Sequence, residues 1–337
     1  MTQRRPTSFD IAALAGVSQP TVSRALSGSP SVSEETRARV MAAAKQLNYT
    51  VDKNASGLRK QQSRTLALLF FEDPTPDDTL INPFYLSMVG ALTRACARAG
   101  YDLLISFQQL SADWHVDYED SRKADGILLL GYGDYRTARQ RLEALVAQGT
   151  HFVRWGAARE GQIGTTVGSD NEQGGYLAGK HLLERGRRNI AFLGVADHSA
   201  PEYLERYNGL CRALREQGLE PVAQIDAIAT EETGRAAAEK LVALGRPFDA
   251  IFATADLAAL GAMRYLHELG ISVPDQVSIV GFDDIAAARL SEPALTSVAQ
   301  DSRRAADTLV STLIAKIEDR APVSVLLPVE LVIRQSS

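Results

Sequence analysis

Short uninterrupted apolar runs alternate with longer amphipathic stretches from residue 64 onward. The apolar runs predict strands at 65–71, 102–107, 126–130, 151–155, 165–168, 189–194, 250–253 and 277–282. The stretches between them predict helices at 84–99, 137–148, 171–185, 202–217, 231–244 and 256–269. Apolar strands that alternate with helices are typical of parallel sheets covered on both faces. The fold class expected for 64–337 is therefore α/β, with two doubly wound parallel-sheet subdomains.

The last part of the sequence predicts how the chain is shared between the two subdomains. Strands expected at 294–299 and 324–333 flank a helix expected at 303–318, an order that lets the chain cross back from one half to the other. We expect an N-subdomain of about 64–164 and 294–323, and a C-subdomain of about 165–293 and 324–337. Doubly wound folds bind ligands outside the carboxyl ends of their strands, so a ligand site between the halves is expected.

The first 26 residues show a different pattern, with two short helices joined by a tight turn at 15–17. Thr7 and Asp10 have the spacing of a capping box at the start of the first helix, and Gly16 suits the end of that helix. The apolar contacts of the first helix are expected from Phe9, Ile11, Ala12, Leu14 and Ala15.

The second short helix begins after Ser18, with Pro20 in its first turn, where a missing N–H costs little. Its outer face carries small polar groups, which is what a helix-turn-helix needs to enter a major groove. The alternative is a pair of ordinary core helices. A third helix is expected at 33–47. The resulting domain prediction is an all-α headpiece at 1–50 and a hinge helix or linker at 51–63, followed by the effector-binding and dimerisation core at 64–337.

The charge distribution separates the two parts of the chain. The whole sequence has a net charge of -5, but residues 1–64 hold ten Lys or Arg and four Asp or Glu, so their net charge is +6 and the rest carries -11. A basic module on an acidic body is the electrostatic signature of a nucleic-acid-binding domain. Cys96 and Cys211 are expected to be separate buried residues, and no spacing suggests a metal or cofactor. Without an export signal or membrane span, a cytoplasmic protein is expected, associated with the nucleoid when bound to DNA.

Residues 10–49, DIAALAGVSQPTVSRALSGSPSVSEETRARVMAAAKQLNY, closely resemble the headpiece of the LacI/GalR family of sugar-responsive repressors. The core carries similar landmarks in order: NPFY (82–85), DGILLLG (125–131), SDNEQGG (169–175), HLLERGRRNIAFLG (181–194), RYNG (206–209), ISVPDQVSIVGFDD (271–284) and PALTSVAQD (293–301). The resemblance implies a homodimer on a near-palindromic double-stranded operator, with paired hinge helices in the minor groove. It also implies a small-molecule effector, expected to be a carbohydrate, between two periplasmic-binding-protein-like subdomains.

The resemblance also assigns DNA-binding positions. Those in and around the recognition helix are Ser18, Gln19, Pro20, Thr21, Ser23 and Arg24, of which Gln19, Pro20 and Arg24 match base-contacting positions. Thr7, Ser18, Thr21 and Ser33 are expected to contact phosphates. Ala55 and Leu58 match the hinge, where Leu58 is expected to wedge between base pairs or, alternatively, to pack on the core. Val51 stands where the family usually has Pro, which leaves the entry to the hinge less fixed.

Effector-binding positions are expected at the carboxyl ends of the strands, namely Phe84, Arg154, Trp155, Arg206, Asp256, Asp283 and Gln300. Asp283 and Arg206 suit sugar hydroxyls, and Phe84 or Trp155 suits the apolar face of a pyranose. The alternatives are that Asp283 caps a helix, that Arg206 pairs with Glu202 or Glu205, and that Trp155 is plain core. Arg154 and Ala255 depart from the Asp and Asn common in relatives, and Arg154 suits an anionic ligand if it faces the site.

Other functions are weighed against this hypothesis. No complete dinucleotide fingerprint, phosphate-binding loop, nucleophile elbow or zinc-protease motif is present, and the five histidines are scattered, so no catalytic residues are expected and the protein is not predicted to be an enzyme. A sugar-binding transport protein fits the core but not the basic headpiece. Purine- or sugar-phosphate-responsive regulation remains an alternative of the same fold. The expected function is a transcriptional repressor of carbohydrate-utilisation genes that responds to a neutral sugar or oligosaccharide.

Overall fold

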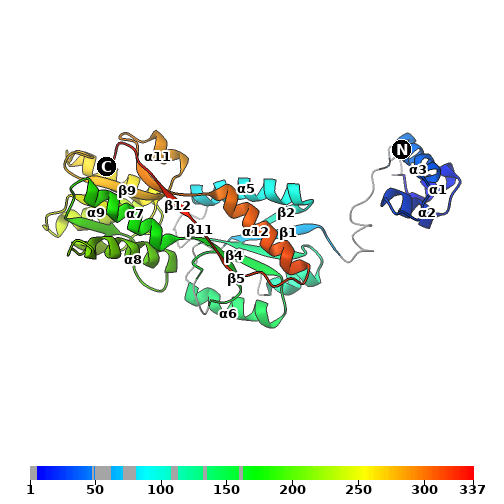
Figure 1. Cartoon of the computed structure of the whole chain (residues 1–337), viewed down its shortest axis with the longest axis horizontal. Coiled ribbons are helices and arrows are strands. Elements are labelled where there is room, and N and C mark those ends of the chain that lie inside the picture. The colour runs from blue at the N-terminus through cyan, green and yellow to red at the C-terminus, as the bar shows by residue number, and fades with distance from the viewer. Residues whose placement is uncertain are drawn as a thin grey trace. The chain divides into compact units, whose positions relative to one another are not determined.

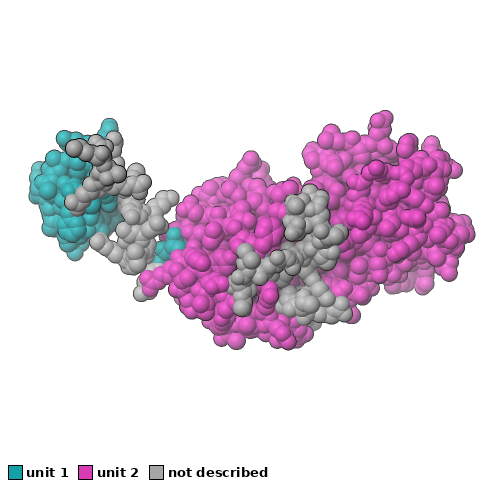
Figure 2. Space-filling model, turned by 180° about the vertical axis from the view of Figure 1, so that it is seen from behind, with its two compact units in different colours: residues 1–63 teal, residues 64–337 magenta. Residues whose placement is uncertain are grey.

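The structure is a computed structural model that describes residues 6–47, 49, 62–70, 81–107, 113–131, 135–158 and 162–337. The chain divides into two compact units, Met1–Ser63 and Arg64–Ser337, coloured separately in Figure 2. Each unit has its own apolar core, so each is described by itself.

The N-terminal unit contains α1 (Ser8–Ala15), α2 (Gln19–Leu26) and α3 (Glu34–Gln46). Thr7 and Asp10 form the predicted capping box, and Gly16 ends α1 in the left-handed conformation with φ of 65°. The buried faces of the three helices meet in one cluster, formed by Ile11, Ala15, Val22, Ala25, Val32, Val40, Ala43 and Ala44. This arrangement of a first helix, a tight turn and a short polar second helix is a helix-turn-helix.

Two apolar residues that were predicted to anchor α1 lie on its surface instead. The side chains of Phe9 and Leu14 are 71% and 47% exposed, so this prediction was wrong. Ile11 and Ala15, one helical turn apart, are the buried residues of α1, and the partly buried Ala12 packs against the same cluster. In so small a unit, α1 has helices on only one side, which leaves its apolar stripe narrow.

The first sheet has the order β11-β5-β4-β3-β1-β2, and all its pairings are parallel. Its strands are β1 (Thr65–Phe70), β2 (Asp102–Phe107), β3 (Gly126–Leu130), β4 (Phe152–Trp155), β5 (Thr165–Ser169) and β11 (Val325–Leu327). Alternate residues of β1 face opposite layers. Leu66 and Leu68 share an apolar cluster with residues of α5 (Pro83–Ala99) and α12 (Ser302–Ile317), and Leu69 shares one with residues of α6 (Tyr135–Ala147). The helices α5 and α12 cover one face of this sheet and α6 covers the other (Figure 1).

The second sheet has the order β12-β10-β9-β8-β6-β7, with β12 antiparallel to β10. Its strands are β6 (Ile190–Leu193), β7 (Ala223–Ile225), β8 (Ala250–Ala253), β9 (Ser278–Asp283), β10 (Thr296–Gln300) and β12 (Val329–Val332). Phe192 and Phe252 face α7 (Asn171–Glu184) and α8 (Pro201–Arg215). The next residue of β6, Leu193, faces α9 (Glu231–Ala243) and α10 (Asp256–Glu268). The predicted α/β class with two doubly wound subdomains is confirmed.

The predicted subdomain boundaries need correction at three strands. β5 and β11 belong to the first sheet, although 165–169 and 325–327 were assigned to the C-subdomain. β10 belongs to the second sheet, although 296–300 was assigned to the N-subdomain. The chain therefore crosses after β5, after β10 and after β11. Local apolar patterns identify strands but do not report which sheet a strand joins. β5 and β10 pair with the strands that precede them in the chain, β4 and β9, whereas β11 pairs with the distant β5.

Some elements were missed in the sequence. β7 is short and only half-buried, and η2 (His115–Asp120) is a π-helix, a rare conformation without a strong local signal. α11 (Ala286–Leu290) is a single short turn. The strand expected at 324–333 is two strands in different sheets, β11 and β12, separated by Pro328, which cannot donate a hydrogen bond to a sheet.

Close contact between α7 and α8 depends on glycine. A Cβ at Gly175 would lie 1.9 Å from the backbone oxygen of Arg206, and one at Gly209 would lie 2.0 Å from that of Glu172. A rotamer change cannot relieve a clash with backbone. The two glycines therefore fix how near α8, and with it Arg206, lies to α7.

We expect Gly175→Ala to lower the free energy of unfolding by about 1–3 kcal/mol, because overpacking forces the backbone apart. Gly90→Ala is the matched control, because a Cβ at this exposed position in α5 meets nothing within 4 Å. Removing the glycine there is expected to raise the same free energy by about 0.5–1 kcal/mol. Urea unfolding measures both; shifts of the same sign and size would contradict the contact.

Candidate nucleic-acid interface and effector site

The helix α2, which the sequence predicts to be the recognition helix, presents its polar residues outward. Val22 and Ala25 are buried, whereas Pro20 and Arg24 are exposed and Thr21 and Ser23 are partly exposed. Gln19 is partly buried and donates from Nε2 to the hydroxyl of Ser8 at 3.2 Å. The exposed face therefore offers a guanidinium group, small hydroxyls and an apolar ring, groups that suit the edges of bases.

The residues expected to contact phosphates occupy helix starts. The hydroxyls of Ser18 and Ser33 accept from the backbone N–H groups of Thr21 and Thr36 at 3.4 and 3.3 Å. Thr7 lies at the start of α1. Helix N-termini attract anions, so these positions suit phosphate groups. The hinge positions Ala55 and Leu58 lie outside the described residues, and so does Val51.

Several predicted effector residues lie where strands end. Trp155 ends β4, Asp283 ends β9 and Gln300 ends β10. Arg206 lies in α8 but reaches the same edge of the second sheet, since it donates to the carbonyl of Thr254 just beyond β8 at 2.5 Å. The carboxyl edge of the second sheet thus brings Arg206, Asp283 and Gln300 together.

Arg206 is the centre of this cluster and is only 1% exposed. Its Nε donates to Asn171 Oδ1 at 3.0 Å, and its Nη1 lies 4.0 Å from Asp283 Oδ1. The guanidinium carbon lies 3.7 Å from the ring centroid of Phe282. A buried guanidinium fixed in this way presents its remaining donors in one rigid orientation.

Asp283 is held from two sides. Gln300 Nε2 donates to its Oδ1 at 2.6 Å, and Arg206 Nη1 lies 4.0 Å from the same oxygen. Burial raises the pKa of Asp283 to about 6, although the charge of Arg206 and the hydrogen bond from Gln300 oppose that rise. At neutral pH the carboxyl group is therefore mostly ionised and serves as a hydrogen-bond acceptor.

The two predicted aromatic residues are neighbours in the other subdomain. The ring centroids of Phe84, at the start of α5, and Trp155 are 6.0 Å apart. Both side chains are buried within the apolar cluster that contains Leu68 and Phe70. This burial supports the alternative that Trp155 is a core residue. Trp155 also lies at the end of β4, where an effector-binding residue is expected.

Arg154 is turned toward protein groups. Its Nη2 donates to Gln162 Oε1 and to the carbonyl of Ala157 at 3.4 Å. Its Nη1 and the Oε1 atom of Glu202 both border the space beside the Cα of Gly156. Glu202, in the first turn of α8, also accepts from the backbone N–H of Ala157 at 2.8 Å, a contact that joins the two subdomains.

Asp256 does not have the place expected of an effector ligand. Its side chain is fully buried, and its two oxygens accept from Ser297 Oγ at 2.6 Å and from the backbone N–H of Ile285 at 2.8 Å. We correct the sequence-based assignment accordingly. The physical reason is that Gly281 leaves room for the carboxyl group against β9, where a Cβ would lie 2.2 Å from Oδ1.

Three residues of the cluster were not predicted. Asn171 follows β5 and holds Arg206, Phe282 lies under the guanidinium group, and Glu202 joins the subdomains. Asn171 lies in the sequence landmark SDNEQGG and Phe282 in GFDD, so these landmarks could have indicated both residues. Glu202 lies one helical turn before Arg206, so it shares a face of α8 with a nominated residue.

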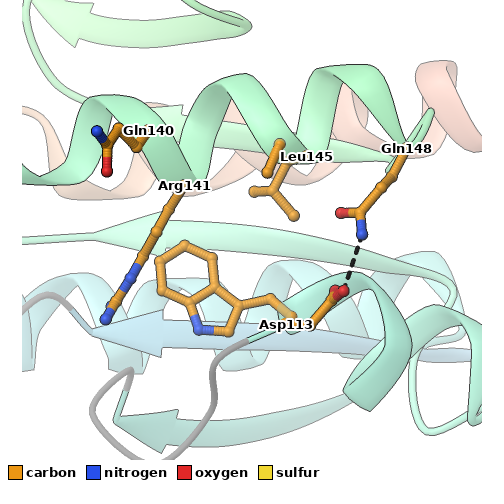
Figure 3. Close-up of a pocket in the computed structure, with 7 residues that line it drawn as sticks. Asp113, Gln140, Arg141, Leu145 and Gln148 are labelled. Carbon is orange, nitrogen blue, oxygen red and sulfur yellow. Dashed lines mark hydrogen bonds between the residues drawn. The ribbon is translucent and has the colours of Figure 1, made fainter.

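A separate open pocket is lined by Asp113 and Trp114, which come just before η2, and by residues of α6 (Figure 3). Its volume is about 180 Å³. Arg141 lies 5.3 Å above the ring of Trp114, and Gln148 Nε2 donates to Asp113 at 2.9 Å. None of the predicted site residues lines it.

Among the described residues there is no group of three or more His, Cys, Asp or Glu side chains arranged to hold a metal ion. Within the same part of the chain, no helix combines the length and apolar character that membrane crossing requires. Cys96 and Cys211 are buried and unbridged, as predicted.

Two family models match the chain. The model of bacterial regulatory proteins, lacI family, matches residues 9–52, and that of the periplasmic binding protein-like domain matches 180–337. The HTH-type transcriptional regulator CelR of Thermobifida fusca is 32% identical over 341 residues, covering 99% of each chain. The HTH-type transcriptional repressor PurR of Mannheimia succiniciproducens is 29% identical and covers 97% of each.

Two solved structures are similar to this chain in fold over nearly its whole length. A CelR–cellobiose complex is 30% identical with a TM-score of 0.72, covering 99% of this chain and 100% of that one. A lac repressor dimer bound to operator and the anti-inducer ONPF is 26% identical with a TM-score of 0.83, covering 99% of each.

Proposed function

The chain belongs to the LacI family of DNA-binding transcriptional regulators, and from this premise we propose that it binds a near-palindromic operator as a homodimer and responds to a neutral sugar. The family and the regulator function follow from relatives that cover nearly the whole chain. The operator contacts proposed are those of α2, whose polar face is exposed, with hinge contacts from Ala55 and Leu58. A cytoplasmic location, with association to the nucleoid on DNA, accompanies this function.

The effector site proposed is the cluster of Arg206, Asp283 and Gln300, completed by Phe84 and Trp155 from the other subdomain. A carboxylate acceptor, a forked donor and aromatic rings are the groups that bind a saccharide. The observation that supports a neutral effector is the orientation of Arg154, whose guanidinium group donates to Ala157 and Gln162. Its charge is thus directed at the protein. A relative of known structure holds cellobiose.

A purine effector is the second candidate, since several relatives are named as PurR repressors. Thermal shift separates the candidates, because a ligand that binds only the folded state raises the melting temperature by mass action. We expect cellobiose or another neutral saccharide to raise it, and purine bases and glucose 6-phosphate to leave it unchanged. Asp283→Asn is expected to abolish the shift. A shift from purine bases alone would overturn the sugar proposal.

The homodimer proposal rests on β2, an edge strand of the first sheet. Leu104, Ile105 and Phe107 are 38%, 46% and 46% exposed, and Leu86 of the neighbouring α5 is also exposed. An apolar edge strand invites pairing with a second chain, and the related lac repressor is described as a dimer. A second copy of this chain is the proposed partner.

Ile105→Lys is expected to convert the dimer to a monomer, because it places a charge in the proposed apolar contact. Light scattering after gel filtration measures the mass directly. Val146→Lys is the control, because Val146 is a similarly exposed apolar residue on α6, which covers the sheet away from β2. An unchanged dimer mass in the Ile105 variant would place the interface elsewhere.

A further inference from the structure

The turn that follows β9 has an uncommon backbone. Asp283 and Asp284 have φ angles of 111° and 49°, in the left-handed region that residues with a side chain rarely adopt. Such a conformation is unfavourable for a residue with a side chain, and it persists only where the surrounding structure holds it. The side chain of Asp283 depends on this turn for its direction toward Arg206.

Three groups hold the turn in place. Asp256 Oδ2 accepts from the backbone N–H of Ile285 at 2.8 Å, and Ser297 Oγ accepts from that of Asp284 at 3.0 Å. Ser297 in turn donates to Asp256 Oδ1 at 2.6 Å. On the outer side, Arg334 Nη2 donates to the carboxylate of Asp284 at 2.5 Å. Asp256 is thus linked to two successive residues of the turn, directly and through Ser297.

Asp256 is costly for the protein to keep. It is fully buried, and burial together with the neighbouring charge of Asp283 raises its pKa well above the ordinary value. A carboxyl group that loses its hydration on burial is weak evidence for stability, so a role in fixing geometry accounts better for its presence. Gly281, without a Cβ, admits the carboxyl group to this position.

We propose that Asp256 is a positioning residue for the effector site, which fixes the 283–285 turn through Ile285 and Ser297 and so aims Asp283 at the ligand without touching it. The role toward the ligand rests on the proposed function, whereas the role toward the turn does not. In the motif GFDD, each residue then has its own part. Gly281 admits Asp256, Phe282 supports Arg206, Asp283 faces the ligand and Asp284 binds Arg334.

Hydrogen exchange of the intact protein, followed by mass spectrometry, tests the proposal without a ligand. Asp256→Ala is expected to speed exchange at the amides of Asp284 and Ile285 at least tenfold. Asp256→Asn is expected to restore slow exchange, because its amide oxygen still accepts from Ile285. Ser297→Ala, a milder change, is expected to speed exchange at Asp284, so the proposal stays testable if Asp256→Ala does not fold.

Asp249→Ala is the matched control. Asp249 also accepts from backbone N–H groups, those of Arg188 and Asn189, but at the amino edge of the same sheet. It is expected to leave exchange at 284 and 285 unchanged. Equal exchange there in the Asp256→Ala, Ser297→Ala and Asp249→Ala variants would overturn the positioning role.

The melting shift with cellobiose separates this proposal from the proposed function. Loss of the shift in both Asp256→Ala and Asp283→Asn, with faster exchange in the first, supports both proposals. Faster exchange with an unchanged shift in both variants would uphold the role of Asp256 in the turn and overturn both its role toward the ligand and the proposed effector site. If cellobiose gives no shift with the parent protein, the exchange result decides the role in the turn.

Discussion

Arg206→Ala is expected to abolish the effector-induced melting shift and to lower the free energy of unfolding by about 3–5 kcal/mol, since removal of one partner of a buried charged pair leaves the other uncompensated. Arg206 is 1% exposed, and its Nη1 lies 4.0 Å from Oδ1 of the buried Asp283. The same change removes the donor to Thr254 and the contact with Phe282. Both effects come from one side chain, and urea unfolding and a ligand melting shift measure them separately.

Arg212→Ala supplies the control on the same helix. Arg212 forms an ion pair with Glu172 at 2.7 Å, but both side chains are more than 40% exposed. Exposed pairs contribute about 1 kcal/mol or less, so stability is expected to change little and the melting shift to remain. If the two variants lost similar amounts of stability and both kept the shift, the central place given to Arg206 would be wrong.

Arg24→Ala is expected to weaken operator binding by a factor between about thirty and about twenty thousand. A good contact from Arg to a base contributes roughly 1–3 kcal/mol of discrimination, and a homodimer makes the contact twice. Arg24 is exposed near the end of α2, beside the buried Ala25 that anchors the helix. The operator for the measurement is selected from a pool of randomised duplexes with the parent protein, and fluorescence anisotropy gives the affinities.

Arg39→Ala is the control for charge. Arg39 is exposed on α3, outside the recognition helix. Its loss is expected to affect binding to all duplexes alike, because the attraction of an exposed positive charge to the phosphate backbone carries no sequence information. Arg24→Ala should instead relax the preference at one position in each half-site. If both variants showed the same loss and the same sequence preference, Arg24 would not be a base-reading residue.

The sequence was most informative where local pattern and chemistry coincide. The caps at Thr7, Ser18 and Ser33 and the buried β1 and β3 follow from residue types at fixed spacings, and the structure has them close to where they were predicted. Arg206 and Asp283 were nominated 77 positions apart and are neighbours in space, because both elements reach the carboxyl edge of one sheet.

The errors concern tertiary packing, which the local pattern does not report. β5 and β10 were assigned to the wrong subdomains although each pairs with the strand that precedes it in the chain, β4 and β9. Asp256 is of a residue type that often binds ligands, but its burial against Gly281 depends on packing between α10 and β9. Phe9 is apolar, which predicts a core position, but its side chain is exposed because the small three-helix unit packs against only one side of α1. None of these outcomes can be predicted from the local pattern of apolar and polar residues.

The central claim is that the N-terminal unit binds a two-fold symmetric duplex and that a sugar held by the core changes that binding. The most direct measurement is the affinity of the full chain for its selected operator, by fluorescence anisotropy at fixed salt, with and without the saccharide that raises the melting temperature. Coupling between such sites is typically about 1–3 kcal/mol, so we expect the dissociation constant to change by roughly five- to 150-fold. An operator affinity that is identical with and without saturating sugar, or no better than that for random duplex, would contradict the account.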